Sequence, residues 1–126
     1  MNARLCLIVA SMSGAIAVMI GAFTAHALKD ILTSKLMAVM QTGVQYQFYH
    51  SLALLLVGLL LQQRSTALLK LSAMSFFAGI VLFCGSLYLL AFSGVHWLGI
   101  VTPVGGLAFI VGWLMLVWNF ITMDKR

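Results

Sequence analysis

The sequence has no glutamate, one proline and two cysteines among its 126 residues. Charged residues make up only 7% of the chain, whereas soluble domains carry about 25%, so they cannot cover a water-facing surface. This scarcity excludes a soluble enzyme and a disordered segment, and two cysteines in apolar runs exclude a disulfide scaffold. Hydrophobic residues instead reach 63%. Composition and length predict a single integral membrane domain over residues 1–126.

Four continuous apolar runs are long enough to cross a bilayer as helices. A crossing needs about 20 apolar residues, because each residue rises about 1.5 Å and the hydrocarbon is ~30 Å thick. The runs cover about residues 5–25, 42–61, 71–92 and 103–122. Because they do not alternate, they predict an all-α bundle of four transmembrane helices rather than a small barrel. A cleaved signal peptide is an alternative interpretation of the first run, since Ala25-His26-Ala27 fits a cleavage pattern.

The connections between the runs predict three further features. Apolar residues at positions 28, 31, 32, 36, 39 and 40 share one side of a helix, which indicates a short amphipathic surface helix over about residues 28–40. The polar connection at residues 62–70 is short, so the second and third spans are expected to be antiparallel neighbours. Thr102 and Pro103 are expected to be the N-cap and first-turn proline of the fourth span.

The basic residues are divided unequally between the two ends of the predicted bundle. Five of the seven lie near the N-terminus, in the 62–70 connection or near the C-terminus, and only Lys29 and Lys35 belong to the other end. The positive-inside rule therefore predicts that both termini are cytoplasmic. Because the basic residues form no continuous stripe, nucleic acid is excluded as a partner, and membrane lipids with anionic headgroups are expected instead.

Uncharged polar residues gather in the half of the predicted bundle that is opposite the termini, and His50 lies near the mid-plane. Tyr46 is four residues before His50 and shares its helix face, and Gln47, three residues before His50, is also its neighbour. An ionisable residue at this depth suggests a functional site. We expect a neutral His50 that faces the bundle, with Ser86 or Tyr88 as its partner. The candidate ligand-binding residues are His26, Tyr46, Gln47, His50, Ser86 and Tyr88.

Two other interpretations of these polar residues stay open. They can serve only as hydrogen-bonding groups between helices, which contribute about 0.6–2 kcal/mol each. Alternatively, His26, His50 and His96 can be read as metal or haem ligands. The predicted depths of the three histidines disagree, and neither a cysteine nor an acidic residue is near them, so no metal and no cofactor is expected. There is also no nucleophile–base pair, and the lack of an intramembrane carboxylate argues against a coupled transporter.

Four segments together resemble a known family. They are Gly21–His26 (GAFTAH), residues 41–50 (QTGVQYQFYH), Gly85–Tyr88 (GSLY), and residues 102–106 (TPVGG) followed by Gly112-Trp113. In these segments the chain resembles the small bacterial inner-membrane proteins of domain-of-unknown-function family 423, the YgdD-like proteins, over about residues 14–113. The resemblance implies a four-span protein of the bacterial inner membrane, and it implies no reaction.

These observations favour a non-enzymatic accessory protein or a protein that binds a lipid or another small amphiphile. The alternative is a small channel or transporter formed as a homo-oligomer, and a metal- or haem-binding membrane protein comes third. The expected partners are membrane lipids, further copies of the same chain and a larger membrane complex that the sequence does not identify.

Overall fold

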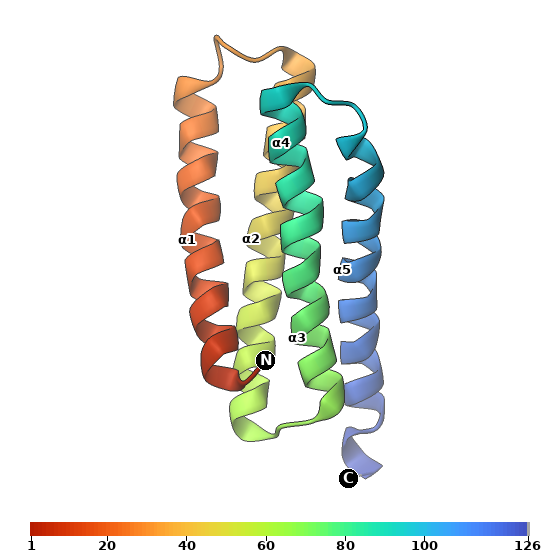
Figure 1. The fold of residues 1–126 in the computed structure, drawn as a ribbon. Helices are drawn as coiled ribbons and strands as arrows, with labels where there is room; N and C mark the ends of the chain where they lie inside the picture. The colour runs from red at the N-terminus through yellow and green to blue at the C-terminus, as the bar shows by residue number, and fades with distance from the viewer. Residues whose placement is uncertain (126) are drawn as a thin grey trace.

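The computed structural model describes residues 1–125, and within them every regular element is a helix (Figure 1). The first crossing is α1 (Ala3–Ala27) and the second is α2 (Ser34–Gln63). The third consists of α3 (Ala67–Gly79), the π-helical turn η1 (Ile80–Cys84) and α4 (Gly85–Ser93). The fourth is α5 (Leu98–Ile121), which is followed by the short 3-10 helix η2 (Met123–Lys125). All four crossings are long and apolar enough to span a membrane, which confirms the predicted all-α bundle.

Short polar residues and one glycine set the ends of these helices. The side chains of Asn2, Thr33 and Thr66 accept hydrogen bonds from the third backbone N–H that follows them, at 2.9, 3.2 and 3.1 Å respectively. Each therefore satisfies a donor that has no partner within its own helix. Gly94 ends α4 in the left-handed conformation, with φ of 69°. As Figure 1 shows, the chain reverses direction three times, and both termini lie at the same end as the α2–α3 connection.

The structure corrects the expected surface helix over residues 28–40. Residues 28–33 form turns, and Thr33 caps α2, which continues without interruption from Ser34 into the membrane span. The apolar periodicity that suggested a separate helix has another cause, because Leu28 and Met40 pack together with Ala91 in a small buried cluster at this end of the bundle. Leu28 and Met40 therefore face α4, whereas Ile31 of the same periodic set is 73% exposed.

The start of the fourth crossing also differs from the expectation. Helix α5 begins at Leu98, so Thr102 and Pro103 lie inside the helix rather than at its cap. The Thr102 hydroxyl donates to the Leu98 carbonyl at 3.4 Å and lies 2.6 Å from the Ser86 hydroxyl on α4. The threonine therefore joins two helices, and a role as a cap is not needed.

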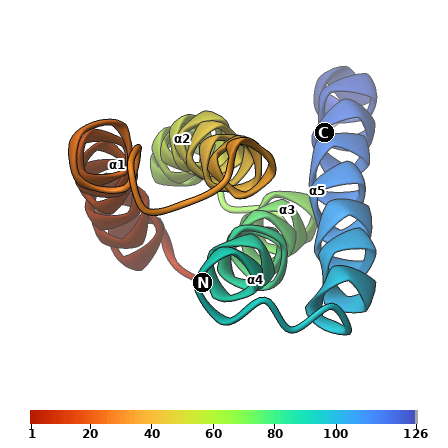
Figure 2. The ribbon, with the colours of Figure 1, turned by 90° about the horizontal axis from the view of Figure 1, so that it is seen from above.

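The helices are packed unevenly. In Figure 2, α1 and α5 lie on opposite sides of the molecule, with α2 and the third crossing between them. Helix α1 packs mainly against α2, whereas α5 packs against α3 and η1. Helix α5 approaches η1 so closely that a Cβ atom added at Gly105 would collide with the backbone of Phe83. This close contact leaves α5 displaced from α2, and the candidate site lies between these two helices.

Candidate functional site

An open groove of about 690 Å³ runs between α2 and α5 and has Phe83 of η1 in its wall. Its lining is mostly apolar and aromatic, which is typical of sites that hold small organic molecules. The groove opens on the side of the bundle, where acyl chains would surround the protein in a membrane. It is lined by Tyr46, His50, Phe83, Pro103, Gly106, Leu107, Phe109, Ile110 and Trp113.

His50 lies at the inner wall of the groove, and both of its ring nitrogens are hydrogen-bonded. Its Nδ1 lies 2.7 Å from the Tyr46 carbonyl oxygen, and its Nε2 accepts from the indole N–H of Trp113 at 3.1 Å. A carbonyl can only accept, so the Nδ1 atom carries the proton and the imidazole is in a neutral form. The side chain is only 6% exposed. His50 therefore presents a ring to the groove rather than a free polar atom.

The aromatic rings around His50 form a continuous wall. The imidazole stacks on Phe109 with ring centroids 3.6 Å apart and an interplanar angle of 12°. Phe83 stacks on Tyr46 at 4.8 Å and lies 5.4 Å from Phe109. Phe83 belongs to η1, and single π-helical turns are frequent at functional sites. This wall can hold a flat ring or a flexible acyl chain by dispersion contacts.

Tyr46 supplies the polar group that remains at the groove. The ring nitrogens of His50 and Trp113 are already hydrogen-bonded, to each other and to the backbone carbonyl of Tyr46. For the Tyr46 hydroxyl, no hydrogen bond is found within residues 1–125, and the side chain is 40% exposed. A ligand with one hydroxyl, carbonyl or ester group can hydrogen-bond there while its apolar part fills the remaining volume.

A second polar cluster lies on the other side of α2 and is closed. The Gln47 amide donates to the Ser13 carbonyl at 2.9 Å and accepts from the Tyr88 hydroxyl at 2.6 Å. The Ser51 hydroxyl is within hydrogen-bonding distance of both the Ser13 hydroxyl, at 2.7 Å, and the Gln47 carbonyl, at 2.6 Å. These bonds connect α1, α2 and α4 through side chains that are buried or half-buried. We call Ser13, Gln47, Ser51 and Tyr88 the inner network.

The six residues predicted from the sequence do not form one site. Tyr46 and His50 line the groove, whereas Gln47 and Tyr88 belong to the inner network. Ser86 pairs with Thr102 and donates to the Phe83 carbonyl at 2.9 Å, away from His50. His26 is exposed at the end of α1. The expected partners of His50 are therefore corrected, because its partner from another helix is Trp113 rather than Ser86 or Tyr88.

Helix α5 contributes groove residues that were not among the six predicted from the sequence. Gly106, Phe109, Ile110 and Trp113 follow one another at helical spacings of three and one, so they lie on one side of α5. That spacing was visible in the sequence as a helix face. Which neighbour the face meets depends on how the helices pack, and the sequence pattern of one helix does not contain that information.

The three histidines are not brought together as a metal or haem site would require. His50 is buried in the middle of α2, while His26 and His96 are exposed in separate segments. Across the part of the chain that the structure describes, no group of three or more His, Cys, Asp or Glu side chains is close enough to hold a metal ion.

Comparison with known proteins gives one consistent result. Residues 20–106 match the family described as "Protein of unknown function (DUF423)". The chain is 39% identical over 126 residues to the UPF0382 inner membrane protein YgdD of Escherichia coli strain K12, which covers all of this chain and 96% of that protein. It is 41% identical to the UPF0382 membrane protein YwdK of Bacillus subtilis strain 168, with 90% and 94% of the two chains covered.

A UPF0382 membrane protein of Staphylococcus epidermidis is 43% identical over 114 residues, which are 90% of this chain and 93% of that protein. No solved structure matches the chain. The names of these relatives describe membrane proteins and specify neither a ligand nor a reaction.

Proposed function

The chain belongs to the DUF423 family of membrane proteins, and we propose that it is a non-enzymatic member that binds a lipid or another small amphiphile in the α2–α5 groove. The observation that carries this proposal is the aromatic wall beside His50, which faces an open volume on the membrane side of the bundle. The volume of the α2–α5 groove lies within the range of about 300–1,000 Å³ that is typical of small-molecule sites.

The chemistry of the wall indicates how such a ligand would lie. Phe83, Leu107 and Ile110 would contact the apolar chain or ring, and the Tyr46 hydroxyl would bind a polar group. The bonded pair of His50 and Trp113 would hold the inner wall rigid. A molecule with an apolar body and one oxygen-bearing group, such as a phospholipid or a quinone, has this combination of features.

A pair of glycine substitutions tests the proposal. A Cβ atom at Gly106 meets only Phe83 at 3.8 Å, so Gly106→Leu should fold while its side chain occupies the groove. Gly85→Leu is the matched control, because a Cβ atom there meets nothing within 4 Å and Gly85 does not line the groove. Mass spectrometry of protein purified in mild detergent would measure the lipids and quinones that each variant retains.

We expect Gly106→Leu to retain roughly tenfold less of the bound amphiphile, which corresponds to the loss of a few apolar contacts. Gly85→Leu should retain as much as the unsubstituted protein. Equal retention by the two variants, or no retained amphiphile in the unsubstituted protein, would contradict the proposal.

We also propose that the chain lies in a bacterial inner membrane with both termini in the cytoplasm. The Escherichia coli relative is named an inner membrane protein. Both termini and the α2–α3 connection lie at one end of the bundle, and the sequence places five of its seven basic residues there. A reporter that is active only in the cytoplasm, fused after residue 126, should be active. A silent cytoplasmic reporter together with an active periplasmic one would reverse the orientation.

We also propose that the chain forms a homo-oligomer. Small residues of α1, namely Ala17, Gly21 and Ala22, lie beside Val44 and Phe48 in an open apolar groove of about 420 Å³. Small residues allow helices to approach closely inside a membrane. Native mass spectrometry across several mild detergents should show more than one protomer. A single-protomer mass would argue against both the oligomer and the alternative of an oligomeric channel, whereas an accessory role in a larger membrane complex stays a prediction.

A further inference from the structure

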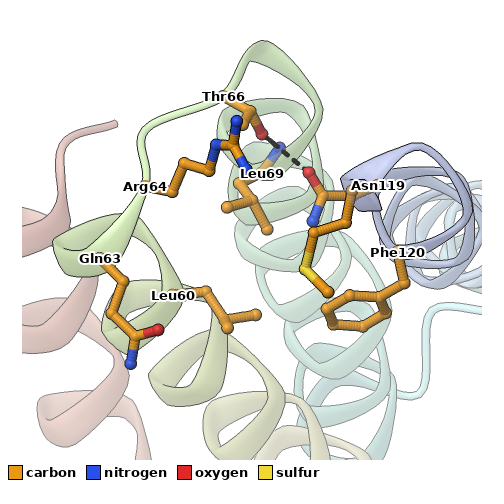
Figure 3. A pocket seen from close by; sticks show the side chains of 8 residues that line it. Leu60, Gln63, Arg64, Thr66, Leu69, Asn119 and Phe120 are labelled. Carbon is orange, nitrogen blue, oxygen red and sulfur yellow. Dashed lines mark hydrogen bonds between the residues drawn. The ribbon is translucent and has the colours of Figure 1, made fainter. Parts of the chain in front are cut away.

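A second, smaller pocket lies at the end of the bundle that holds both termini. It has a volume of about 290 Å³ and is built by the end of α2, the start of α3 and the end of α5. Figure 3 shows the Arg64 guanidinium above the pocket, on the same side as Thr66 and Asn119, with Leu60 and Leu69 below. The pocket is therefore polar and basic at its rim and apolar beneath. It shares no lining residue with the α2–α5 groove.

The polar rim is built into the fold. The Asn119 side chain is only 4% exposed, and its Oδ1 accepts from the Thr66 hydroxyl at 2.9 Å. The same hydroxyl oxygen accepts from the backbone N–H of Leu69 at 3.1 Å and so caps α3. The N-terminus of α3, with the partial positive charge of its helix dipole, is thereby fixed at the pocket wall. Helix N-termini and guanidinium groups both favour phosphate.

The surrounding charge has the same sign. Arg4 at the start of α1 and Lys70 in the first turn of α3 lie at the same end of the bundle as Arg64, and Asp124 is the acidic residue at this end among residues 1–124. The other acidic residue of the chain, Asp30, lies in the connection at the opposite end. An anion approaching this pocket therefore meets a net positive potential.

We propose that this pocket binds the phosphate of an anionic phospholipid. A guanidinium carries five N–H donors and can bind two phosphate oxygens at once. The pocket volume suits a headgroup rather than a whole lipid, so the acyl chains lie outside it, along the apolar side chains of Leu60 and Phe120 toward the membrane interior. The apolar floor favours a lipid over free phosphate, and basic pockets between transmembrane helices are known sites for acidic headgroups.

Two matched substitutions test the site. Arg64→Gln removes the guanidinium from the pocket, whereas Lys70→Gln removes the same charge from the same end at an exposed residue that does not line the pocket. The full-length protein in mild detergent would be titrated with phosphatidylglycerol and with phosphatidylcholine of identical acyl chains. Native mass spectrometry would count the bound lipids.

The unsubstituted protein should prefer phosphatidylglycerol, and Arg64→Gln should weaken that preference roughly fivefold. Lys70→Gln should keep the preference within about twofold, because a charge outside the pocket acts only through screened attraction. Arg64→Lys keeps the charge without the planar fork, so an intermediate loss is expected, and this variant guards against a folding defect.

Three outcomes would overturn the proposal. One is equal weakening by Arg64→Gln and Lys70→Gln, which would indicate a diffuse charge effect. Another is the absence of any preference for the anionic lipid. The third is full displacement of the lipid by millimolar inorganic phosphate, which would identify soluble phosphate as the ligand. The groove variant Gly106→Leu should leave this preference unchanged, so the two sites can fail independently.

Discussion

The two sides of α2 use neighbouring polar residues in opposite ways. On one side, Gln47 is enclosed by α1 and α4, and its amide bonds to Ser13 and Tyr88 in the inner network. On the other side, three residues later, His50 bonds to Trp113 at the edge of an open groove. Both residues are buried, with 5% and 6% of their surface exposed. The difference therefore lies in what the surrounding helices leave open, and not in the burial of the two residues.

The packing of α5 explains the open side. Gly105 allows α5 to contact the backbone of η1, and Gly112 allows it to pack on Phe76, where an added Cβ atom would come within 2.7 Å of the ring. Helix α5 is thus held against the third crossing rather than against α2. His50 and Trp113 connect α2 to α5 through their side chains across the space that remains. Gly105 therefore controls the shape of the groove without lining it.

The largest expected effect comes from inserting a methyl group into the close contact between Gly105 and η1. Gly105→Ala should destabilise the protein by about 3 kcal/mol, because the new methyl group meets backbone of Phe83 that cannot rotate away. Gly106→Ala, one residue later, meets only ring atoms of Phe83 at 3.8 Å or more. It should be neutral or stabilise the protein by up to about 1 kcal/mol through helix propensity. Unfolding of both variants by sodium dodecyl sulfate in mixed micelles would measure the difference.

The two alanine variants separate packing from helix propensity. Since both replace a helical glycine of α5, propensity alone would move them in the same direction. A Gly105→Ala protein as stable as Gly106→Ala would mean that α5 can move away from η1 at little cost. In that case the close contact would not be what holds the groove open.

A smaller effect is expected on the enclosed side of α2. Gln47→Leu leaves the Tyr88 hydroxyl without its acceptor and the Ser13 carbonyl without its side-chain donor, which should cost about 2 kcal/mol. Gln45→Leu is the control, because Gln45 is exposed on the same helix. It should leave the free energy of unfolding nearly unchanged. The same micelle unfolding assay applies, and equal costs for the two variants would show that the inner network contributes nothing specific.

The sequence predicted the crossings better than the contacts between them. Continuous apolar runs locate all four crossings, because apolarity over about 20 residues is a local property. The expected starts were less exact, since α2 begins at Ser34 and α5 at Leu98, whereas the runs began at residues 42 and 103. Helical spacing made Tyr46 and Gln47 neighbours of His50, but only Tyr46 lies with His50 at the groove, because Gln47 turns toward α1 and α4. The assignment of partners failed where it depended on a non-local event, the close approach of α5 to η1 at Gly105. Trp113 therefore appeared as part of a family motif and not as the partner of His50.

The smallest expected effect concerns the pair that joins the two helices across the groove. His50→Leu and Trp113→Phe each remove one partner of the 3.1 Å hydrogen bond and keep apolar bulk at the position. A double-mutant cycle should give a coupling energy of about 1 kcal/mol, as is typical of hydrogen bonds between membrane helices. A coupling near zero would show that the bond does not contribute to stability.

The same two variants distinguish a structural role of the pair from a role in binding. If the pair only joins helices, both single variants should retain amphiphile as the unsubstituted protein does, since the rest of the wall is intact. If the pair holds the inner wall of the groove, each variant should retain less amphiphile while remaining folded. His50→Leu removes the imidazole that stacks on Phe109, and Trp113→Phe removes the indole that holds this imidazole in place. The proposed function requires the second result. The inner-network variant Gln47→Leu should not reproduce it, because Gln47 faces the other side of α2.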